Sequence, residues 1–431
     1  MNLSDIEAGL LDDRVKGMPG GVAPFPLSAI AAKGWNVLAE DLPLPLCVLH
    51  QRALDHNARW MRAFLGAANA VIAPHGKTTM SPQLFRRQLE DGAWATTVAN
   101  AQQIHVARHY GFARIVLANQ LVGKQIIRFV LDELKRDPSF EFFCLADSVA
   151  VVESMARAAR ERPAGRPIQV LLEGGIVGAR TGCRDLDAAR AVAHAVKAAE
   201  PYLVLRGVEG FEGILTGATP EEAAARVDKF LDFLAAIALG CEDLFAPGPI
   251  ILSAGGSAYY DRVVERFGRA GLKRPTMILT RSGCYLTHDH VMYSDLFAAL
   301  SKRSPHLHNL GEGPRPALEV WGYIQSRPEP TRALATLGKR DVSYDPHLPV
   351  PDRWYRPGTT PRRPQPVPPG HRVSVLNDQH AYLDLPADSP LQVGDMVGFG
   401  ISHPCLTFDK WQVICVVDDD YDVIAAVRTF F

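Results

Sequence analysis

Apolar and polar positions alternate along this chain in two different ways. Between about residues 50 and 290, short apolar runs rich in β-branched residues alternate with amphipathic stretches, the pattern of repeated βα units around a parallel sheet. Eight strands are expected, at 71–74, 94–98, 114–118, 142–146, 168–173, 204–211, 250–254 and 277–280. Eight strands with intervening helices predict an α/β fold with a closed (β/α)8 barrel.

Helix-start signals fill the gaps between these runs. Ser81-Pro82, Asn100, Ser148 and the sequence Thr219-Pro220-Glu221-Glu222 each precede an amphipathic stretch and are typical of helix N-termini. An earlier apolar run at 44–50 precedes a helix with its own apolar stripe. That run would be a ninth strand, so we expect it to lie outside the barrel.

Beyond about residue 305 the pattern changes to that of antiparallel strands. We expect strands within 317–326, 372–385, 395–402, 411–419 and 422–431. A proline-rich stretch from 346 to 369 is expected to be an extended linker. The predicted organisation is therefore a barrel over 45–300 and an all-β domain over 301–431, which the N-terminal segment 1–44 is expected to join.

Composition and net charge indicate which class of ligand the protein binds. The chain has 431 residues, a net charge of -1 and 22% charged residues, which gives no electrostatic reason to expect nucleic acid or a membrane. The acidic start carries no secretion signal, so we expect a cytoplasmic protein with a small-molecule ligand. Seven scattered cysteines without a CxxC pair indicate neither a disulfide framework nor a zinc ribbon, and most are expected to be small buried hydrophobes.

Polar residues follow most of the expected barrel strands, and a barrel gathers such residues at one mouth. They are His75 and Lys77, Asn119, Arg180, Glu212, Gly255 to Ser257, and Arg281 with Tyr285. A lysine amine at such a mouth can bond to an aldehyde cofactor, and a Gly-Gly-Ser turn before a helix can bind phosphate. Taken singly, the lysine is more simply explained as a solvated side chain and the Gly-Gly-Ser segment as a plain turn. Together they suit pyridoxal 5'-phosphate, which needs an amine at one end and an anion site at the other.

Six motifs in a fixed order resemble those of one known family. They are PHGKTT (74–79), RTGCR (180–184), SAGGS (253–257), TRSGCYLTHD (280–289), LGKRDVSYD (337–345) and GDMVGFGISHPCLTF (394–408). This series is similar to that of the D-serine dehydratase and D-threonine aldolase family, which includes amino acid deaminase-like proteins. The family is a branch of the fold-type III, alanine-racemase-like pyridoxal-phosphate enzymes, and the resemblance extends from about Leu44 to Phe431.

The resemblance implies roles for particular residues. Lys77 would carry the cofactor covalently and act as the catalytic base. The phosphate would be held by Gly255, Gly256, Ser257 and Tyr285. Arg180 would approach the pyridine nitrogen, with Arg281 as a rival for that role. His75, Asn119 and His380 are candidate substrate contacts, although His380 is equally well explained as a structural histidine.

The last motif also implies a metal. In the family the position of His403 and Cys405 holds a catalytic zinc, and imidazole with thiolate is a pair that Zn²⁺ or another divalent metal accepts. With one residue between them, the two side chains would point the same way on a strand. An isolated HxC would more often be two unrelated residues, so the metal expectation depends on the resemblance.

These expectations predict a lyase acting on a D-amino acid. The first candidate activity is a pyridoxal-phosphate- and zinc-dependent D-3-hydroxyamino-acid dehydratase, for example one converting D-serine to pyruvate and ammonia. The alternatives are a metal-dependent D-threonine aldolase, which would release glycine and an aldehyde, and a non-catalytic pyridoxal-phosphate-binding protein. The resemblance also implies a homodimer, whereas the accepted side chain at the β-carbon stays open.

Overall fold

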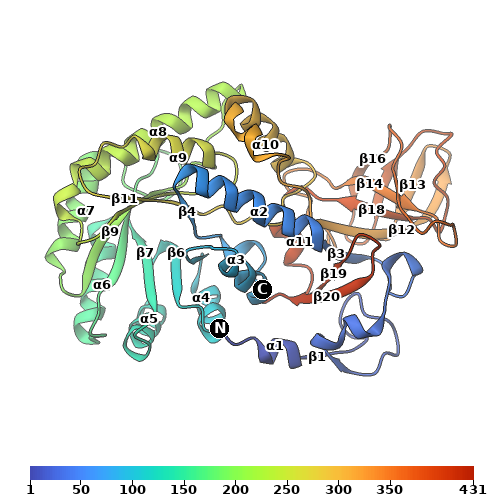
Figure 1. The fold of residues 1–431 in the computed structure, drawn as a ribbon, viewed down its shortest axis with the longest axis horizontal. Coiled ribbons are helices and arrows are strands. Elements are labelled where there is room, and N and C mark those ends of the chain that lie inside the picture. The colour runs from blue at the N-terminus through green and yellow to red at the C-terminus, as the bar shows by residue number, and fades with distance from the viewer.

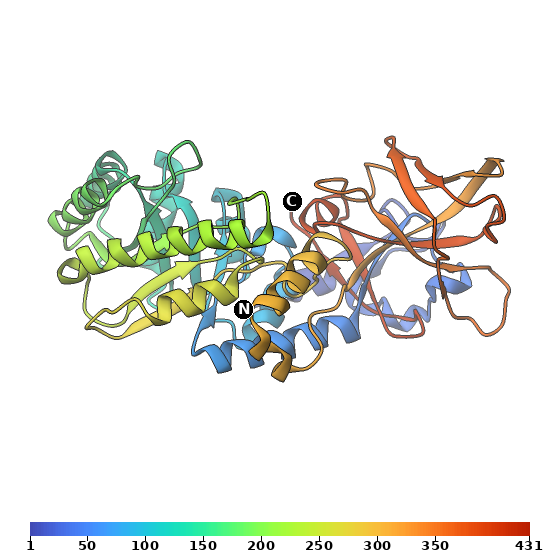
Figure 2. The same cartoon turned by 90° about the horizontal axis from the view of Figure 1, so that it is seen from above.

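The computed structural model describes the backbone of residues 1–431 and all side chains except those at 305, 306 and 308. Two lobes lie side by side (Figures 1 and 2): a barrel of parallel strands surrounded by helices, and a domain built mainly of antiparallel strands. The N-terminal segment begins beside the barrel, where the N–H of Asn2 donates to Tyr110 O at 3.2 Å, and then runs to the β-domain before the first long helix begins (Figure 1).

The barrel contains eight strands, all parallel, in the sheet order β4-β11-β10-β9-β8-β7-β6-β5. The sheet closes because His75 pairs with Thr97, and the N–H of Thr97 donates to Pro74 O at 2.9 Å. The expected closed (β/α)8 barrel is therefore confirmed. The strands are β4 (Val71–Ile72), β5 (Thr96–Val98), β6 (Arg114–Gln120), β7 (Glu141–Ala146), β8 (Ile168–Glu173), β9 (Leu203–Gly210), β10 (Ile250–Ala254) and β11 (Thr276–Thr280).

Helices cover the outer face of the barrel and bury their apolar sides against it (Figure 1). Three of the expected N-caps form, since the side chains of Asn100, Ser148 and Thr219 each accept a backbone N–H from the first turn. The helices are α2 (Gln51–Ala68), α3 (Pro82–Glu90), α4 (Ala101–His109), α5 (Lys124–Arg136), α6 (Val149–Glu161), α7 (Leu186–Ala198), α8 (Pro220–Gly240), α9 (Tyr260–Gly268) and α10 (Met292–Arg303).

Side chains from different strands fill the inside of the barrel. This cluster includes Val116, Phe143, Leu171, Ile251 and Leu279, each almost fully buried. The barrel is thus a packed core rather than a channel, and ligands can reach only its ends.

The β-domain is a ten-stranded sheet in which the only parallel pair among the described residues joins β19 to β3. Its strands are β3 (Leu46–His50), β12 (Leu318–Glu329), β13 (Arg332–Ala335), β14 (Val350–Tyr355), β15 (Gln365–Pro366), β16 (Arg372–Leu376), β17 (Ala381–Asp384), β18 (Met396–Gly400), β19 (Val413–Val417) and β20 (Val423–Arg428). The remaining elements are α1 (Ser4–Ala8), β1 (Leu10–Leu11), β2 (Phe25–Pro26), α11 (Cys405–Phe408) and six short 3-10 helices, η1 (Leu27–Ala29), η2 (Ala31–Lys33), η3 (Val37–Ala39), η4 (Gly76–Thr78), η5 (Glu242–Leu244) and η6 (Pro305–Leu310).

Two boundaries differ from the expected ones. The strand β3 lies outside the barrel, as expected, but it pairs with β12 and β19, so residues 46–50 belong to the β-domain sheet and not to a barrel range that starts at 45. The proline-rich stretch 346–369 is not a linker, because β14 pairs with β18 and with β15 inside it. The sheet tolerates Pro351 because the register shifts between Pro351 and Arg353, where the ladder is interrupted.

Among the described residues, no helix has both the length and the apolar character needed to cross a lipid bilayer.

Candidate active site between the two domains

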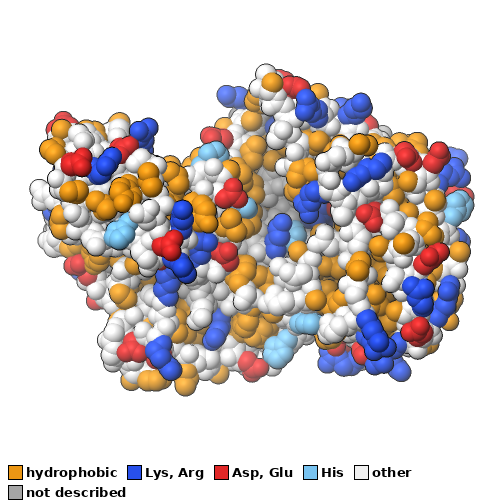
Figure 3. Space-filling model, turned by 180° about the vertical axis from the view of Figure 1, so that it is seen from behind, with side chains coloured by type: hydrophobic (Ala, Val, Ile, Leu, Met, Phe, Trp, Pro, Cys, Tyr) orange, Lys and Arg blue, Asp and Glu red, His pale blue; other side chains and the backbone are white. Residues whose placement is uncertain are grey.

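A cavity of about 460 Å³ lies at the carboxyl ends of the barrel strands and is bounded on its far side by the β-domain. Figure 3 shows the molecule from behind, with a hollow between the two lobes in which basic side chains are visible. The residues predicted from the sequence that line this cavity are His75, Lys77, Arg180, Gly255, Gly256, Ser257, Arg281, His403 and Cys405.

Lys77 reaches the cavity from η4, directly after β4. Gly76 lets this turn pack tightly, because a Cβ there would lie 2.6 Å from the ring of Phe85. The Nδ1 atom of His75 accepts the backbone N–H of Lys77 at 3.4 Å. Burial, followed by the nearby charges of Lys77 and Arg281, lowers the pKa of His75 well below 6.5, so His75 is a neutral acceptor that fixes the backbone of the lysine.

Arg281 is the buried cation of the site. It follows β11, its Nη2 donates to the carboxylate of Glu209, and its Nε donates to Ser253 Oγ at 3.3 Å. Burial raises the pKa of Glu209 to about 7, although Arg281 opposes this shift. Arg180, the other predicted arginine, is exposed in the loop after β8 and lies 5.2 Å from the ring centre of Phe211. Both arginines line the cavity, but only Arg281 is held rigidly.

The loop after β10 is bound to a carboxylate from the neighbouring strand end. The N–H groups of Gly255 and Gly256 donate to Glu212 at 3.0 and 2.6 Å, and Glu212 is fully buried. Ser257, Ala258 and Gly283 also line the cavity, and their backbone N–H groups have no acceptor among the described residues. The backbone amides that are free to bind an anion are therefore those of Ser257 and Ala258, just before α9, and of Gly283, in the turn after β11.

His403 and Cys405 enter the cavity from the β-domain, but not from a strand as the spacing suggested. β18 ends at Gly400, and Cys405 is the first residue of α11. Both side chains reach the cavity because the chain turns at His403, which has a left-handed φ of 67°. Such a conformation is unfavourable for a residue with a side chain and needs support from its surroundings.

That support comes from Asp289, which sequence reasoning did not single out. Its Oδ2 accepts the N–H of His403 at 2.8 Å, and its Oδ1 accepts the N–H groups of Val291 and Tyr293 at 3.0 and 2.8 Å. Asp289 is almost fully buried. It therefore joins the turn at His403 to the barrel loop and to the start of α10.

A second cysteine, also missed, lies beside the first. Cys284 Sγ is 3.8 Å from Cys405 Sγ, and Thr78 Oγ1 is within 3.6 Å of both sulfurs. The interaction with Cys284, together with His403 and against burial, lowers the pKa of Cys405 well below 9.0, and the same pairing raises the pKa of Cys284. Both cysteines lie in motifs quoted above, but their contact joins positions 121 residues apart in the chain, which the spacing within a motif does not indicate.

Three predicted residues do not line this cavity. Tyr285 is buried between α2 and α3, where Gln88 and Asp91 influence its hydroxyl. Asn119 donates its side-chain amide to Ala99 O at 2.7 Å. His380 lies in the turn between β16 and β17, where its carbonyl accepts the N–H of Asn377.

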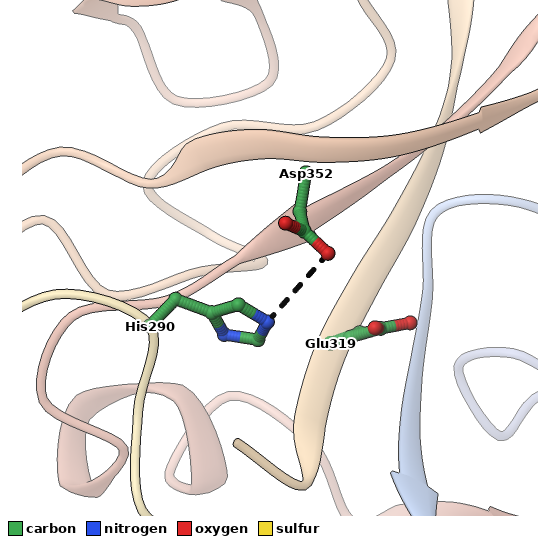
Figure 4. Close-up of side chains that lie close together, drawn as sticks. All are labelled: His290, Glu319 and Asp352. Atoms are coloured by element: carbon green, nitrogen blue, oxygen red, sulfur yellow. Dashed lines mark ion pairs between the residues drawn. The ribbon is translucent and has the colours of Figure 1, made fainter. Parts of the chain in front are cut away.

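A separate cluster has the spacing of a metal site. His290, Glu319 and Asp352 bring three ligand atoms within 4.8 Å of one another, the only such trio found among the described residues (Figure 4). Arg353 forms ion pairs with both carboxylates, with its Nε 3.6 Å from Glu319 and 3.2 Å from Asp352. We therefore interpret the cluster as an ion-pair network that joins the loop after β11 to β12 and β14, outside the cavity that holds Lys77.

Comparison with known families agrees with this architecture. The family model for the N-terminal domain of alanine racemase matches residues 49–267, about half of the chain. The chain belongs to this family. A second model, described as a putative serine dehydratase domain, matches residues 317–417 in the β-domain. Membership of the alanine-racemase-like family implies pyridoxal 5'-phosphate as the cofactor.

Several solved structures share the fold over nearly the whole chain. D-threonine aldolase from Filomicrobium marinum has a TM-score of 0.72 at 20% identity, covering 92% of this chain and 97% of that one. D-threo-3-hydroxyaspartate dehydratase from Delftia sp. HT23 has a TM-score of 0.70 at 18% identity, covering 92% and 99%. An alanine racemase-like protein from Idiomarina loihiensis has a TM-score of 0.66 at 14% identity, covering 90% and 96%. No curated sequence matches the chain.

The residues of the cavity fit pyridoxal phosphate. A lysine amine, a buried arginine and three unpaired backbone amides line the same space, which are the groups that an aldehyde, a pyridine ring and a phosphate require. The fit differs from the predicted one in the phosphate contacts. Gly255 and Gly256 donate to Glu212, and Tyr285 does not line the cavity, so Ser257, Ala258 and Gly283 offer the amides that are free to bind phosphate.

Proposed function

We propose that the protein is a pyridoxal-phosphate- and metal-dependent dehydratase of a small D-3-hydroxyamino acid, releasing a 2-oxo acid and ammonia. One observation carries the proposal. Lys77 from the barrel and the His403-Cys405 pair from the β-domain line the same cavity. A 3-hydroxyamino acid has its amino group and its hydroxyl on neighbouring carbons, so one small substrate can meet both sets of groups.

When bound, pyridoxal phosphate would supply an electron sink at the substrate α-carbon, and a divalent metal would supply a Lewis acid for the β-hydroxyl. Lys77 is the residue that would hold the cofactor and move the α-proton, since it is the lysine of the cavity lining. His403 and Cys405 would hold the metal. Arg180 and Arg281 both stay candidates for the ring nitrogen, and neither can give up its proton at neutral pH.

The chemistry of Cys405 supports elimination over the aldolase reaction. The resemblance associates an aspartate with the aldolase branch at this position, whereas this chain has a cysteine. Among the solved structures with this fold is a cysteine-to-alanine variant of D-threo-3-hydroxyaspartate dehydratase, described as being in the metal-free form. That description supports a role for a cysteine in metal binding in the similar protein, and we extend the role to Cys405 by proposal.

Product analysis tests the proposal. The purified protein, supplied with pyridoxal phosphate and Zn²⁺, is incubated with D-serine, D-threo-3-hydroxyaspartate or D-threonine, with and without a chelator. We expect a 2-oxo acid and ammonia in equal amounts from at least one substrate, and loss of both with the chelator. Glycine and an aldehyde from D-threonine would establish the aldolase instead, and a cofactor absorbance band without any product would indicate a non-catalytic binding protein.

Asp289 offers a separate test through the metal. Replacing Asp289 with asparagine keeps its size but sets an amide donor or a weaker acceptor against the N–H of His403. We expect metal affinity to fall roughly 10- to 100-fold, the usual effect of losing a residue that orients a ligand. Chelator competition measures the change. Asp295→Asn, at an exposed position on α10, is the control and should leave the affinity unchanged; an equal loss in both variants would contradict the role of Asp289.

A further inference from the structure

We propose that Cys284 is a third protein ligand of the metal, so that the site is Cys284, Cys405 and His403 with one open coordination position. The inference rests on the proposed function only for the existence of a metal at His403 and Cys405. It concerns a residue that neither the spacing of the last motif nor its resemblance to a family indicates.

The separation of the two sulfurs carries the inference. Zn²⁺ binds thiolate sulfur at about 2.3 Å in tetrahedral sites, so two sulfurs on the same ion are about 3.8 Å apart. Cys284 Sγ and Cys405 Sγ are 3.8 Å apart in this structure. A disulfide would require about 2.05 Å, and both cysteines are free.

Residues of both domains position the two sulfurs. Cys284 is buried in the turn after β11, and Cys405 begins α11 on the other domain. Thr78 Oγ1 contacts both sulfurs, at 3.6 and 3.5 Å. Gly283 allows the approach, since a Cβ there would lie 2.5 Å from His75 O. The two thiols therefore meet beside η4, the segment that carries Lys77 and Thr78.

His403 completes the set with a small movement. Within the described residues, the ligand atoms of His403, Cys405 and Cys284 do not all lie within 4.8 Å of one another. Asp289 fixes the backbone of His403 at 2.8 Å, so rotation of the imidazole about its side-chain bonds is the adjustment that metal binding needs. Three protein ligands leave one tetrahedral position for a substrate hydroxyl, as in catalytic zinc sites.

The ligand set also selects the metal. Two thiolates and an imidazole are soft and borderline donors, which favour Zn²⁺ or Co²⁺, whereas Mg²⁺ and Mn²⁺ favour oxygen ligands. The proposal therefore predicts that the protein binds Zn²⁺ and Co²⁺ in preference to Mg²⁺. A site with one thiolate and one imidazole would discriminate less.

Cobalt spectroscopy tests the number of sulfur ligands directly. Co²⁺ is added to the metal-depleted protein, and the thiolate-to-cobalt absorbance is measured for the wild type and for the variants Cys284→Ser and Cys284→Ala. We expect the absorbance per bound Co²⁺ to fall by about half in both variants. Affinity for Zn²⁺, measured by chelator competition, should fall roughly 100-fold, because each of four ligands carries a share of the binding free energy.

Two further variants separate the possible failures. Cys144→Ser, at a buried cysteine in β7, should change neither readout, and thermal unfolding of each metal-free variant checks folding. If Cys405→Ser abolishes binding while both Cys284 variants keep the full absorbance and affinity, Cys284 is not a ligand and the proposed function still stands. If the wild type binds no Co²⁺, the metal itself is excluded and both proposals fail. Fewer than seven free thiols in the metal-depleted protein would indicate a disulfide and would also overturn the ligand role.

Discussion

Replacing Lys77 with alanine is expected to remove both covalent cofactor binding and turnover. The amine of Lys77 lies in the cavity beside a buried arginine and unpaired amides, and no other lysine lines that cavity among the described residues. Loss of the covalent and proton-transfer roles together should lower the turnover rate by at least roughly 10³- to 10⁴-fold. Lys77→Arg should be equally inactive, because a guanidinium keeps the charge but does not form the bond.

Two measurements check this result. The absorbance of the purified protein near the visible edge should show the bound cofactor in the wild type and not in either variant. Borohydride reduction followed by peptide mass analysis should place the cofactor on the peptide that contains residue 77. Lys124→Ala, at an exposed position on α5, serves as the control and should retain both signals. A cofactor adduct on another lysine would rule out Lys77 as the attachment site.

The barrel was predictable because each strand is a short apolar run between amphipathic helices. The expected strands at 168–173 and 250–254 coincide with β8 and β10, and the others differ at their ends by a few residues. The β-domain was less predictable. β14 lies in a proline-rich stretch whose composition resembles a linker, and only its pairing with β18 makes it a strand. β3 could be excluded from the barrel by counting, but its partners β12 and β19 come from the far end of the chain.

In the site, too, features set by local sequence spacing were predictable, and contacts between distant segments were not. Local spacing placed Lys77, Arg281 and Ser257 at strand ends, and the structure brings them to one cavity. Spacing also suggested that His403 and Cys405 share a strand, which is wrong, because a left-handed residue and the start of α11 position them. Contacts such as Cys284 with Cys405 depend on how two domains meet, and periodicity carries no information about that.

Glu212 changes the role of the Gly-Gly-Ser segment. The sequence predicts that this segment binds phosphate, yet two of its backbone amides donate to the carboxylate of Glu212, which follows β9. Burial raises the pKa of Glu212, and the two glycine N–H groups oppose that shift. The carboxylate acts on the loop much as an anionic ligand would, so it fixes the loop geometry and leaves Ser257 to face the cavity. The glycines then serve packing, since a Cβ on Gly255 would lie 2.6 Å from Arg281 Cβ.

Replacing Glu319 with glutamine is expected to lower the free energy of unfolding by several kcal/mol. Glu319 is buried on β12, and one of its carboxylate oxygens lies 2.9 Å from His50 Nε2 and accepts hydrogen bonds from Trp321 and Tyr421 at 3.1 and 3.3 Å. Burial opposes ionisation of Glu319, but His50, followed by His290 and Arg353, outweighs it and lowers the pKa of Glu319 from 4.5 to about 2. That shift corresponds to about 3 kcal/mol of folding free energy, and the variant also leaves His50 and Arg353 without their shared anion.

The effect should depend on pH in a defined direction. The contribution of Glu319 is complete above its ordinary pKa of 4.5 and is lost as the pH falls toward 2. The pKa of His50 is raised, because the attraction of Glu319 outweighs burial, so its contribution is complete below 6.5 and is lost as the pH rises through the raised value. The difference in urea-unfolding free energy between wild type and Glu319→Gln should therefore be largest between about pH 4.5 and 6.5. Glu329→Gln, at the exposed end of the same strand, is the matched control, and a difference that stays constant from pH 3 to pH 9 would show that the charge of Glu319 does not stabilise the fold.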